Sequence, residues 1–89
     1  MCRNITTLRG LEPGATMLEI EAAARQYVRK VSGVQAPSAV TSAAFDRAVL
    51  SVTQATIRLL DELPARRMPP PTLPPLRRKA LVGQQPSAV

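Results

Sequence analysis

The sequence predicts an all-α protein, built as an antiparallel two-helix hairpin with an ordered N-terminal arm and a disordered, Pro-rich basic tail. Two apolar stripes at helical spacing predict the helices, and a change in composition at Pro64 predicts where the tail begins. Residues 1–63 hold all six acids and seven of the twelve bases, whereas residues 64–89 hold five bases, no acid and seven of the nine prolines. We therefore expect a small helical domain over residues 1–63 and a tail over residues 64–89.

A capping box predicts that the first helix begins at Met17 and runs over about residues 17–32. The Thr16 hydroxyl would accept a hydrogen bond from the amide of Glu19, and the Glu19 carboxylate would accept one from the amide of Thr16. Gly33 predicts the end, because glycine enters the left-handed C-cap conformation without a Cβ penalty. Apolar residues recur between these points in steps of three and four. They are Ile20, Ala23, Ala24, Tyr27, Val28 and Val31.

A second, longer stripe predicts a helix over about residues 42–63, which Pro64 ends. Its start is less sharply marked, because Ser38, Thr41 and Ser42 are all suitable N-cap residues. The connection over residues 34–38 is short enough to fold this helix antiparallel against the first. The stripe consists of Phe45, Ala48, Val49, Val52, Thr56, Leu59, Leu60 and Leu63.

The two stripes predict a core that is marginal for one chain. A domain of this length buries only about 60% of its unfolded surface, and the chain has one Phe, one Tyr and no Trp to fill a core. Apolar surface left over by two helices would be covered by the arm or by a second hairpin, which gives a four-helix dimer. The predicted core or interface residues are Ile20, Tyr27, Val31, Phe45, Val49, Val52, Leu59 and Leu60.

Residues 3–9 allow two interpretations. Their Thr and Ile content is compatible with a strand, which would make a ribbon-helix-helix DNA-binding fold a candidate. The apolar residues Ile5, Leu8 and Leu11 step by three, however, which places Ile5 and Leu8 on opposite faces of a strand but on similar sides of a turn or short helix. We therefore favour a short ordered arm that packs over the hairpin.

A series of short motifs through residues 1–63 carries a family resemblance. The motifs are Met1-Cys2-Arg3-Asn4-Ile5, Glu12-Pro13, Val28-Arg29-Lys30-Val31-Ser32-Gly33, Pro37-Ser38 and Ala43-Ala44-Phe45-Asp46-Arg47-Ala48-Val49, followed by Leu59-Leu60-Asp61. In this order they resemble a family of small bacterial proteins classed as a domain of unknown function. The resemblance implies no reaction, ligand or partner. It also implies a charged, helix-prone tail, from which the Pro-rich tail of this chain departs.

Cys2 is the candidate reactive residue. If Met1 is removed, the free α-amine beside the Cys2 thiol could act as a base, which would allow N-terminal-nucleophile chemistry or two-point metal chelation. The simpler interpretation is a small side chain packed on the hairpin or an inert exposed thiol. The chain has no His and no second Cys to complete a metal site. We therefore expect no enzyme activity, no metal and no cofactor, with a Cys2-dependent enzyme or metal site as an alternative.

The tail allows two functional interpretations beside that of a solvated, disordered segment. Its basic residues could bind phosphate backbones weakly and without reading sequence, although no aromatic residue is interleaved for base stacking. Pro71-Thr72-Leu73-Pro74 is a PxxP element of the kind that SH3 domains bind. The candidate anion or nucleic-acid contacts are Arg3, Arg9, Arg66, Arg67, Arg77, Arg78 and Lys79.

These observations together favour a small helical interaction or accessory protein that acts as a homo-oligomer or with a protein partner. The chain contains no apolar run long enough to be a signal peptide or a membrane span. A lone Cys cannot form an internal disulfide, so the cytoplasm is the expected location. Weak nucleic-acid binding through the arm and the tail is the alternative.

Overall fold

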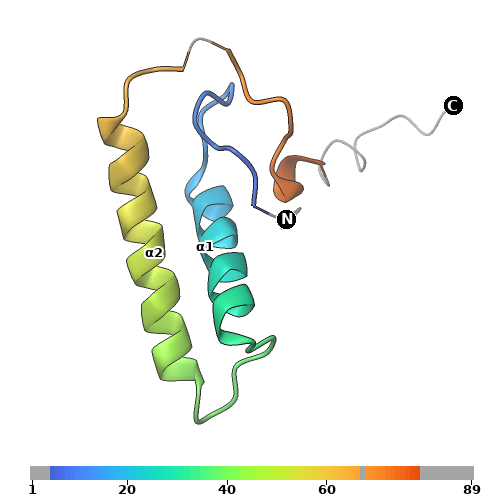
Figure 1. Ribbon diagram of the computed structural model, residues 1–89, viewed down its shortest axis with the longest axis vertical. Helices are drawn as coiled ribbons and strands as arrows, with labels where there is room; N and C mark the ends of the chain where they lie inside the picture. Colours follow the sequence, from blue (N-terminus) through green and yellow to red (C-terminus); the bar gives the residue numbers. More distant parts are fainter. Residues whose placement is uncertain (1–4, 67, 79–89) are drawn as a thin grey trace, which may run out of the picture.

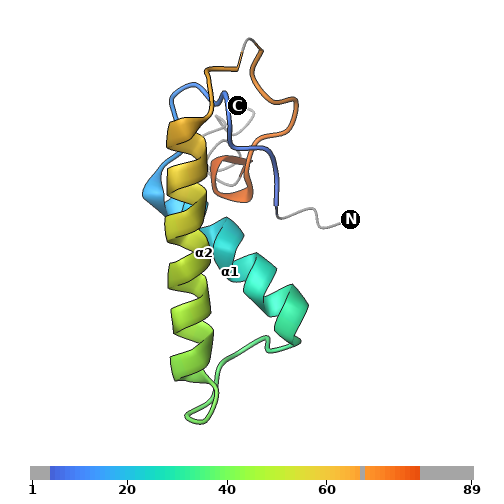
Figure 2. The ribbon, with the colours of Figure 1, turned by 60° about the vertical axis from the view of Figure 1, so that its left-hand side comes forward.

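The computed structural model describes residues 5–66 and 68–78. Two helices, α1 (Met17–Ser32) and α2 (Ser42–Glu62), run antiparallel as a hairpin (Figure 1). Within the described residues all regular structure is helical, which confirms the all-α fold and excludes the ribbon of a ribbon-helix-helix fold there. Figure 2 shows that α1 crosses α2 obliquely, so that the C-terminal end of α1 diverges from its neighbour. Neither helix combines the length and the hydropathy that crossing a membrane requires.

The predicted limits of α1 are confirmed. The Glu19 amide donates to Thr16 Oγ1 at 3.1 Å, and the Thr16 amide donates to Glu19 Oε1 at 2.8 Å. Gly33 ends the helix in the left-handed region, with φ of 75° and its amide bonded to the Arg29 carbonyl at 2.9 Å. Reciprocal capping satisfies two of the amides that a helix N-terminus leaves without partners.

The second helix begins one residue after Thr41 and ends at Glu62, one residue earlier than predicted. Thr41 is the N-cap, but its hydroxyl accepts from the Ser38 amide at 2.8 Å and not from a helix amide. Leu63 is extended, with φ of −80° and ψ of 145°. The residue before a proline is disfavoured in the α region, so Pro64 stops the helix one position early.

Two apolar clusters hold the fold together. In the first, Ala24 and Val28 of α1 pack on Phe45 and Val49 of α2. The second joins the N-terminal arm, residues 5–15, to the hairpin. It contains Leu8, Leu11 and Ile20, with Ala15, Ala23, Ile57, Leu60 and Leu73 partly buried against it.

Five of the eight predicted core residues lie in or beside these clusters. Ile20, Phe45 and Val49 are buried, and Val52 and Leu60 are half-buried. Their contacts come from the helix faces that the periodicity identified. That part of the core was therefore predictable from the spacing of apolar residues alone.

The prediction of burial is wrong for Tyr27, Val31 and Leu59, which are 50%, 65% and 53% exposed. The contact surface of α1 is the row Ile20, Ala24 and Val28, spaced by four residues. Tyr27 and Val31 are not part of that row, and toward the C-terminal end of α1 the two helices diverge (Figure 2). The arm, not a longer helix contact, closes the other end of the hairpin.

Residues 68–78, here called the strap, differ from the disordered tail that the composition predicted. Leu73 packs on the second apolar cluster, and Pro70 and Pro74 are buried. Residues 75–78 form a short helical turn that lies beside α1 and the arm (Figure 1). Proline needs no amide partner, so these residues can be buried without leaving a backbone donor unsatisfied. The rest of the predicted tail, residues 67 and 79–89, lies outside the described residues.

Candidate interaction site

An open groove with a volume of about 280 Å³ lies between the two helices and the arm. We call it the hairpin groove. It exists because the arm covers only one end of the helix pair, and because α1 turns away from α2 at the other end (Figure 2). The residues that line it are Ile5, Thr6, Leu8, Ala23, Ala24, Tyr27, Val52, Thr56 and Leu60.

Exposed apolar side chains border the hairpin groove. Tyr27 and Ile5 line it and are 50% and 39% exposed. Leu59 is one turn along α2 from Thr56, and Val31 is one turn along α1 from Tyr27, which puts both on this side of the hairpin. We call the groove together with Leu59 and Val31 the groove face. It is the surface on which the mispredicted core residues gather.

The groove also contains a polar group without an internal partner. Thr6 Oγ1 is buried and makes no hydrogen bond within the described part of the chain. An unpaired buried hydroxyl is unfavourable, because the group has lost its contact with water without gaining another. The Tyr27 phenol, in contrast, belongs to a half-exposed side chain and gives the groove a group that can form a hydrogen bond.

The arginines that the sequence offered for nucleic-acid contacts are used internally where the structure describes their contacts. Arg9 donates from Nε and Nη2 to the Pro64 carbonyl, at 3.0 and 2.8 Å, and so ties the arm to the end of α2. The Arg66 side chain packs against Gly10, where an added Cβ would lie 3.0 Å from its Cβ and Cδ. Arg78 is exposed on the strap. Cys2, Arg3, Arg67 and Lys79 lie outside the described residues.

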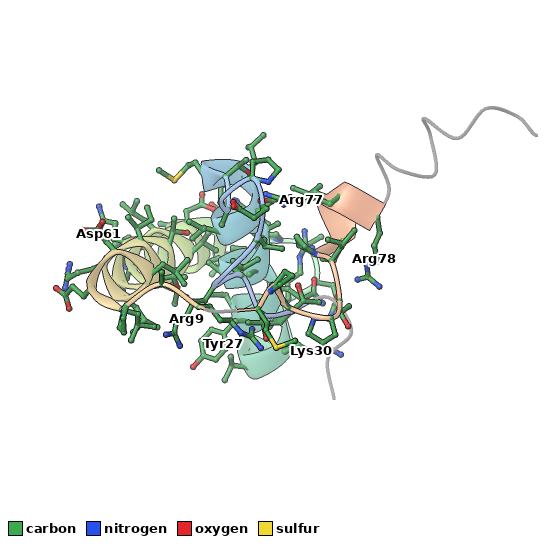
Figure 3. All side chains as sticks on the ribbon, turned by 90° about the horizontal axis from the view of Figure 1, so that it is seen from above. Arg9, Tyr27, Lys30, Asp61, Arg77 and Arg78 are labelled. Atoms are coloured by element: carbon green, nitrogen blue, oxygen red, sulfur yellow. The ribbon has the colours of Figure 1, made fainter. Side chains whose placement is uncertain are left out.

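Arg77 fastens the strap to the N-terminus of α1. Its Nε donates to Glu19 Oε2 at 2.5 Å, and Nη2 donates to Glu19 Oε1 at 3.1 Å. The same Nη2 donates to the carbonyls of Pro13 and Gly14 at 2.6 and 2.9 Å. Only 17% of the Arg77 side chain is exposed, and 4% of Glu19. Figure 3 shows Arg77 toward one side of α1, with Tyr27 and Lys30 toward the other.

The environment of Glu19 favours its charged form. Burial acts to raise the pKa of Glu19, but the hydrogen bonds from Arg77 and from the Thr16 amide, together with the Arg77 charge, outweigh burial and hold the pKa below its ordinary value. Glu19 therefore serves two partners at once, the helix cap and the strap. The charges of Glu19 and Arg77 therefore hold the strap to α1, and both groups are occupied by this ion pair.

A second, larger groove of about 650 Å³ lies between the arm, the end of α2 and the segment that leads to the strap. Leu8, Leu11 and Ile57 are among its apolar lining residues. Charged residues of both signs, including Arg9 and Asp61, line it, so the groove does not favour a ligand of one particular charge. Within the described residues no three acidic or Cys side chains come together in a way that could hold a metal ion.

The PxxP element is not presented as a free ligand. Pro74 is buried, and with Pro75 and Leu76 it encloses a small cavity that it shares with Thr6 and Leu8. A domain that recognises polyproline needs the proline faces exposed. In this conformation the strap would have to detach from the arm before such a domain could bind.

The internal roles of Arg9 and Arg77 could not be predicted from the sequence, because each arginine contacts a group more than fifty residues away, a backbone carbonyl or a capping carboxylate. One signal was available for Arg77. The capping box identifies Glu19 as a capping residue, and a capping carboxylate retains acceptor sites for a cation. Nothing in the spacing of residues 68–78 selected Arg77 over Arg78.

Comparison with protein families gives one finding. The family model described as an uncharacterized conserved protein, DUF2277, matches residues 1–84. The match extends past the residues 1–63 on which the resemblance was recognised and includes the whole strap. No curated protein and no solved structure was found to be similar to the chain.

Proposed function

The chain belongs to this family of uncharacterised conserved proteins, and from that premise we propose that it is a small, non-enzymatic, helical interaction module that binds a protein partner through the groove face. The observation that carries the proposal is the position of Tyr27, Val31 and Leu59. They belong to the same apolar stripes as the core, yet the single chain leaves them half exposed or more.

The size of the core supports this function. Besides Pro70 and Pro74, the described residues contain seven buried apolar side chains, and no large side chain among the described residues is completely buried. A small domain with so little buried surface is marginally stable by itself, and binding of a partner to the folded state stabilises it further. The groove face supplies the apolar area that such a partner would cover.

The chemistry of the groove face also supports a protein partner. Aromatic residues are enriched in the centres of protein interfaces, where Tyr offers a large rigid surface and a hydroxyl that can hydrogen-bond. Tyr27 is one of the residues of α1 that line the groove, and its side chain is half exposed.

Site-specific photo-crosslinking in the native cell tests the proposal. A benzophenone amino acid replaces Leu59 on the groove face or, as the matched control, Leu50. Both leucines are on α2, and they are 53% and 56% exposed. Leu50 does not line the hairpin groove and is nine residues away, which places it on another side of the helix.

The expected result is a discrete crosslinked species with the probe at position 59 and none, or a much weaker one, at position 50. Identification of that species by mass spectrometry names the partner. Equal crosslinking at both positions, or none at either, would contradict the proposal that the groove face is a binding surface.

A further inference from the structure

We propose that the partner on the groove face is a second copy of this chain, arranged with two-fold symmetry and groove face to groove face. This inference rests on the proposed function, since it names the partner of the same surface. It comes from the charges at the two ends of that surface, which are opposite in sign and matched in position.

Lys30 and Glu62 are those charges. Lys30 is three residues after Tyr27 on α1, and Glu62 is three residues after Leu59 on α2, so each lies one turn beyond an exposed apolar residue. Both are exposed. Figure 3 shows Tyr27 and Lys30 projecting on the same side of α1.

The antiparallel hairpin sets these two charges apart. Lys30 lies near the C-terminal end of α1 and Glu62 is the last residue of α2, and the two ends are at opposite ends of the hairpin (Figure 1). They cannot pair with each other inside one chain.

A two-fold axis brings the charges together between copies. In such a dimer, if residue i of one copy contacts residue j of the other, then j also contacts i. The axis lies in the plane of the interface. It passes midway between Lys30 and Glu62 and is perpendicular to the line that joins them. Rotation about it places Lys30 of each copy against Glu62 of the other. Two identical ion pairs result, and the apolar residues lie between them.

The apolar centre suits this arrangement. Tyr27 and Leu59 precede the two charges by one turn, so the same axis that pairs Lys30 with Glu62 also brings Tyr27 of one copy toward Leu59 of the other. An apolar centre with a charged rim is the usual anatomy of a protein interface. The result is a four-helix arrangement whose core includes the residues that the single chain leaves exposed.

Reversal of the two charges tests the inference. We expect the wild-type chain to dimerise in sedimentation velocity experiments over a dilution series at low salt. Lys30→Glu places two acids opposite each other twice in the dimer, and Glu62→Lys does the same with two bases. Each single variant should weaken the dimer about tenfold or more, because like charges replace both rim pairs.

The decisive sample is an equimolar mixture of the two single variants. In the mixed dimer both contacts again join Glu to Lys, so the mixture should recover dimer formation that neither variant shows alone. The double variant should recover it as well. Circular dichroism of each variant checks that the hairpin remains folded, and Leu59→Glu compared with Leu50→Glu checks that the groove face, and not α2 in general, is the interface.

The outcomes separate the two proposals. If the wild type is a monomer, or if the mixture stays as weak as its components, the second-copy inference is overturned. Should a crosslink at position 59 then contain a different protein, the proposed function stands with another partner. If position 59 crosslinks no more than position 50, both proposals fail.

Discussion

Replacement of Arg77 by Ala should destabilise the whole fold, although Arg77 lies within what the composition describes as a tail. The substitution removes two hydrogen bonds to the Glu19 carboxylate and two to backbone carbonyls. Glu19 is 4% exposed, so water cannot fully replace the lost partner. The strap loses its polar attachment to α1 at the same time.

The magnitude follows from the number and the surroundings of these bonds. A hydrogen bond to a charged group contributes about 1.5–3 kcal/mol, and loss of one partner of a fully buried ion pair costs about 3–5 kcal/mol. Arg77 is 17% exposed and the Thr16 amide still binds Glu19, so the loss falls below that range. We expect about 2 kcal/mol, which corresponds to a decrease in Tm of roughly 8–16 °C for a domain of this size.

The same ion pair predicts a pH dependence. The pKa of Glu19 is lowered in the folded chain, so its contribution to stability is present above the unfolded pKa and is lost as the pH falls through the folded value. Because Arg77 is a main cause of the lowering, the difference in stability between the wild type and Arg77→Ala should be full at pH 7. It should shrink as the pH falls below about 4.

Urea and thermal denaturation followed by circular dichroism at 222 nm, at pH 7 and at pH 3, measure both effects. Arg47→Ala is the control, since Arg47 is an exposed arginine of α2. Arg77→Lys should lie between Ala and the wild type, because the ammonium keeps the charge but lacks the fork that reaches Glu19 and the carbonyls together. The reasoning is refuted if Arg77→Ala unfolds at the same temperature as Arg47→Ala, or if its deficit is the same at both pH values.

Two further predictions concern the strap and the core. Deletion of residues 66–89 should lower the Tm by at least as much as Arg77→Ala, because it also removes Leu73 from the second apolar cluster; an unchanged melting curve would show that the strap does not stabilise the body. At concentrations where the chain is monomeric, Phe45→Ala should cost about 3–5 kcal/mol and Leu59→Ala less than about 0.5 kcal/mol, since one side chain is 4% and the other 53% exposed. Comparable losses in the two variants, measured by urea denaturation, would mean that Leu59 is buried in solution.

The helices could be predicted from the sequence because the residues that begin and end them act locally. Thr16, Glu19 and Gly33 act within a few residues of one another, and Pro64 acts on the residue before it. The apolar stripes identified Ile20, Phe45 and Val49 as core for the same reason, since the period of the helix alone decides which residues share a face. These predictions did not depend on how the helices were arranged.

Which residues of the stripes remain exposed could not be predicted in this way. A stripe tells which side of a helix is apolar, but the crossing of α1 over α2 decides how much of that side is covered. Tyr27 and Val31 fall outside the contact, and the groove face results from that geometry. The candidate site was therefore visible in the sequence only as an excess of apolar residues over what one hairpin can bury.

What the sequence alone determined is the two helices, the limits of the first, their antiparallel connection and the shortage of core, all of which depend on interactions between neighbours in the chain. What only the tertiary structure decided is which of the remaining residues meet. Arg77 reaches Glu19 across 58 positions and Arg9 reaches Pro64 across 55, and neither pair has a local signature. The many prolines and the lack of a periodic apolar face predicted that the strap gains too little from burial to become ordered. Two contacts stabilise the strap nevertheless: Leu73 packs on the second apolar cluster, and Arg77 binds a capping carboxylate. The strength of such contacts depends on the residues that surround them in the folded chain and not on the composition of the segment.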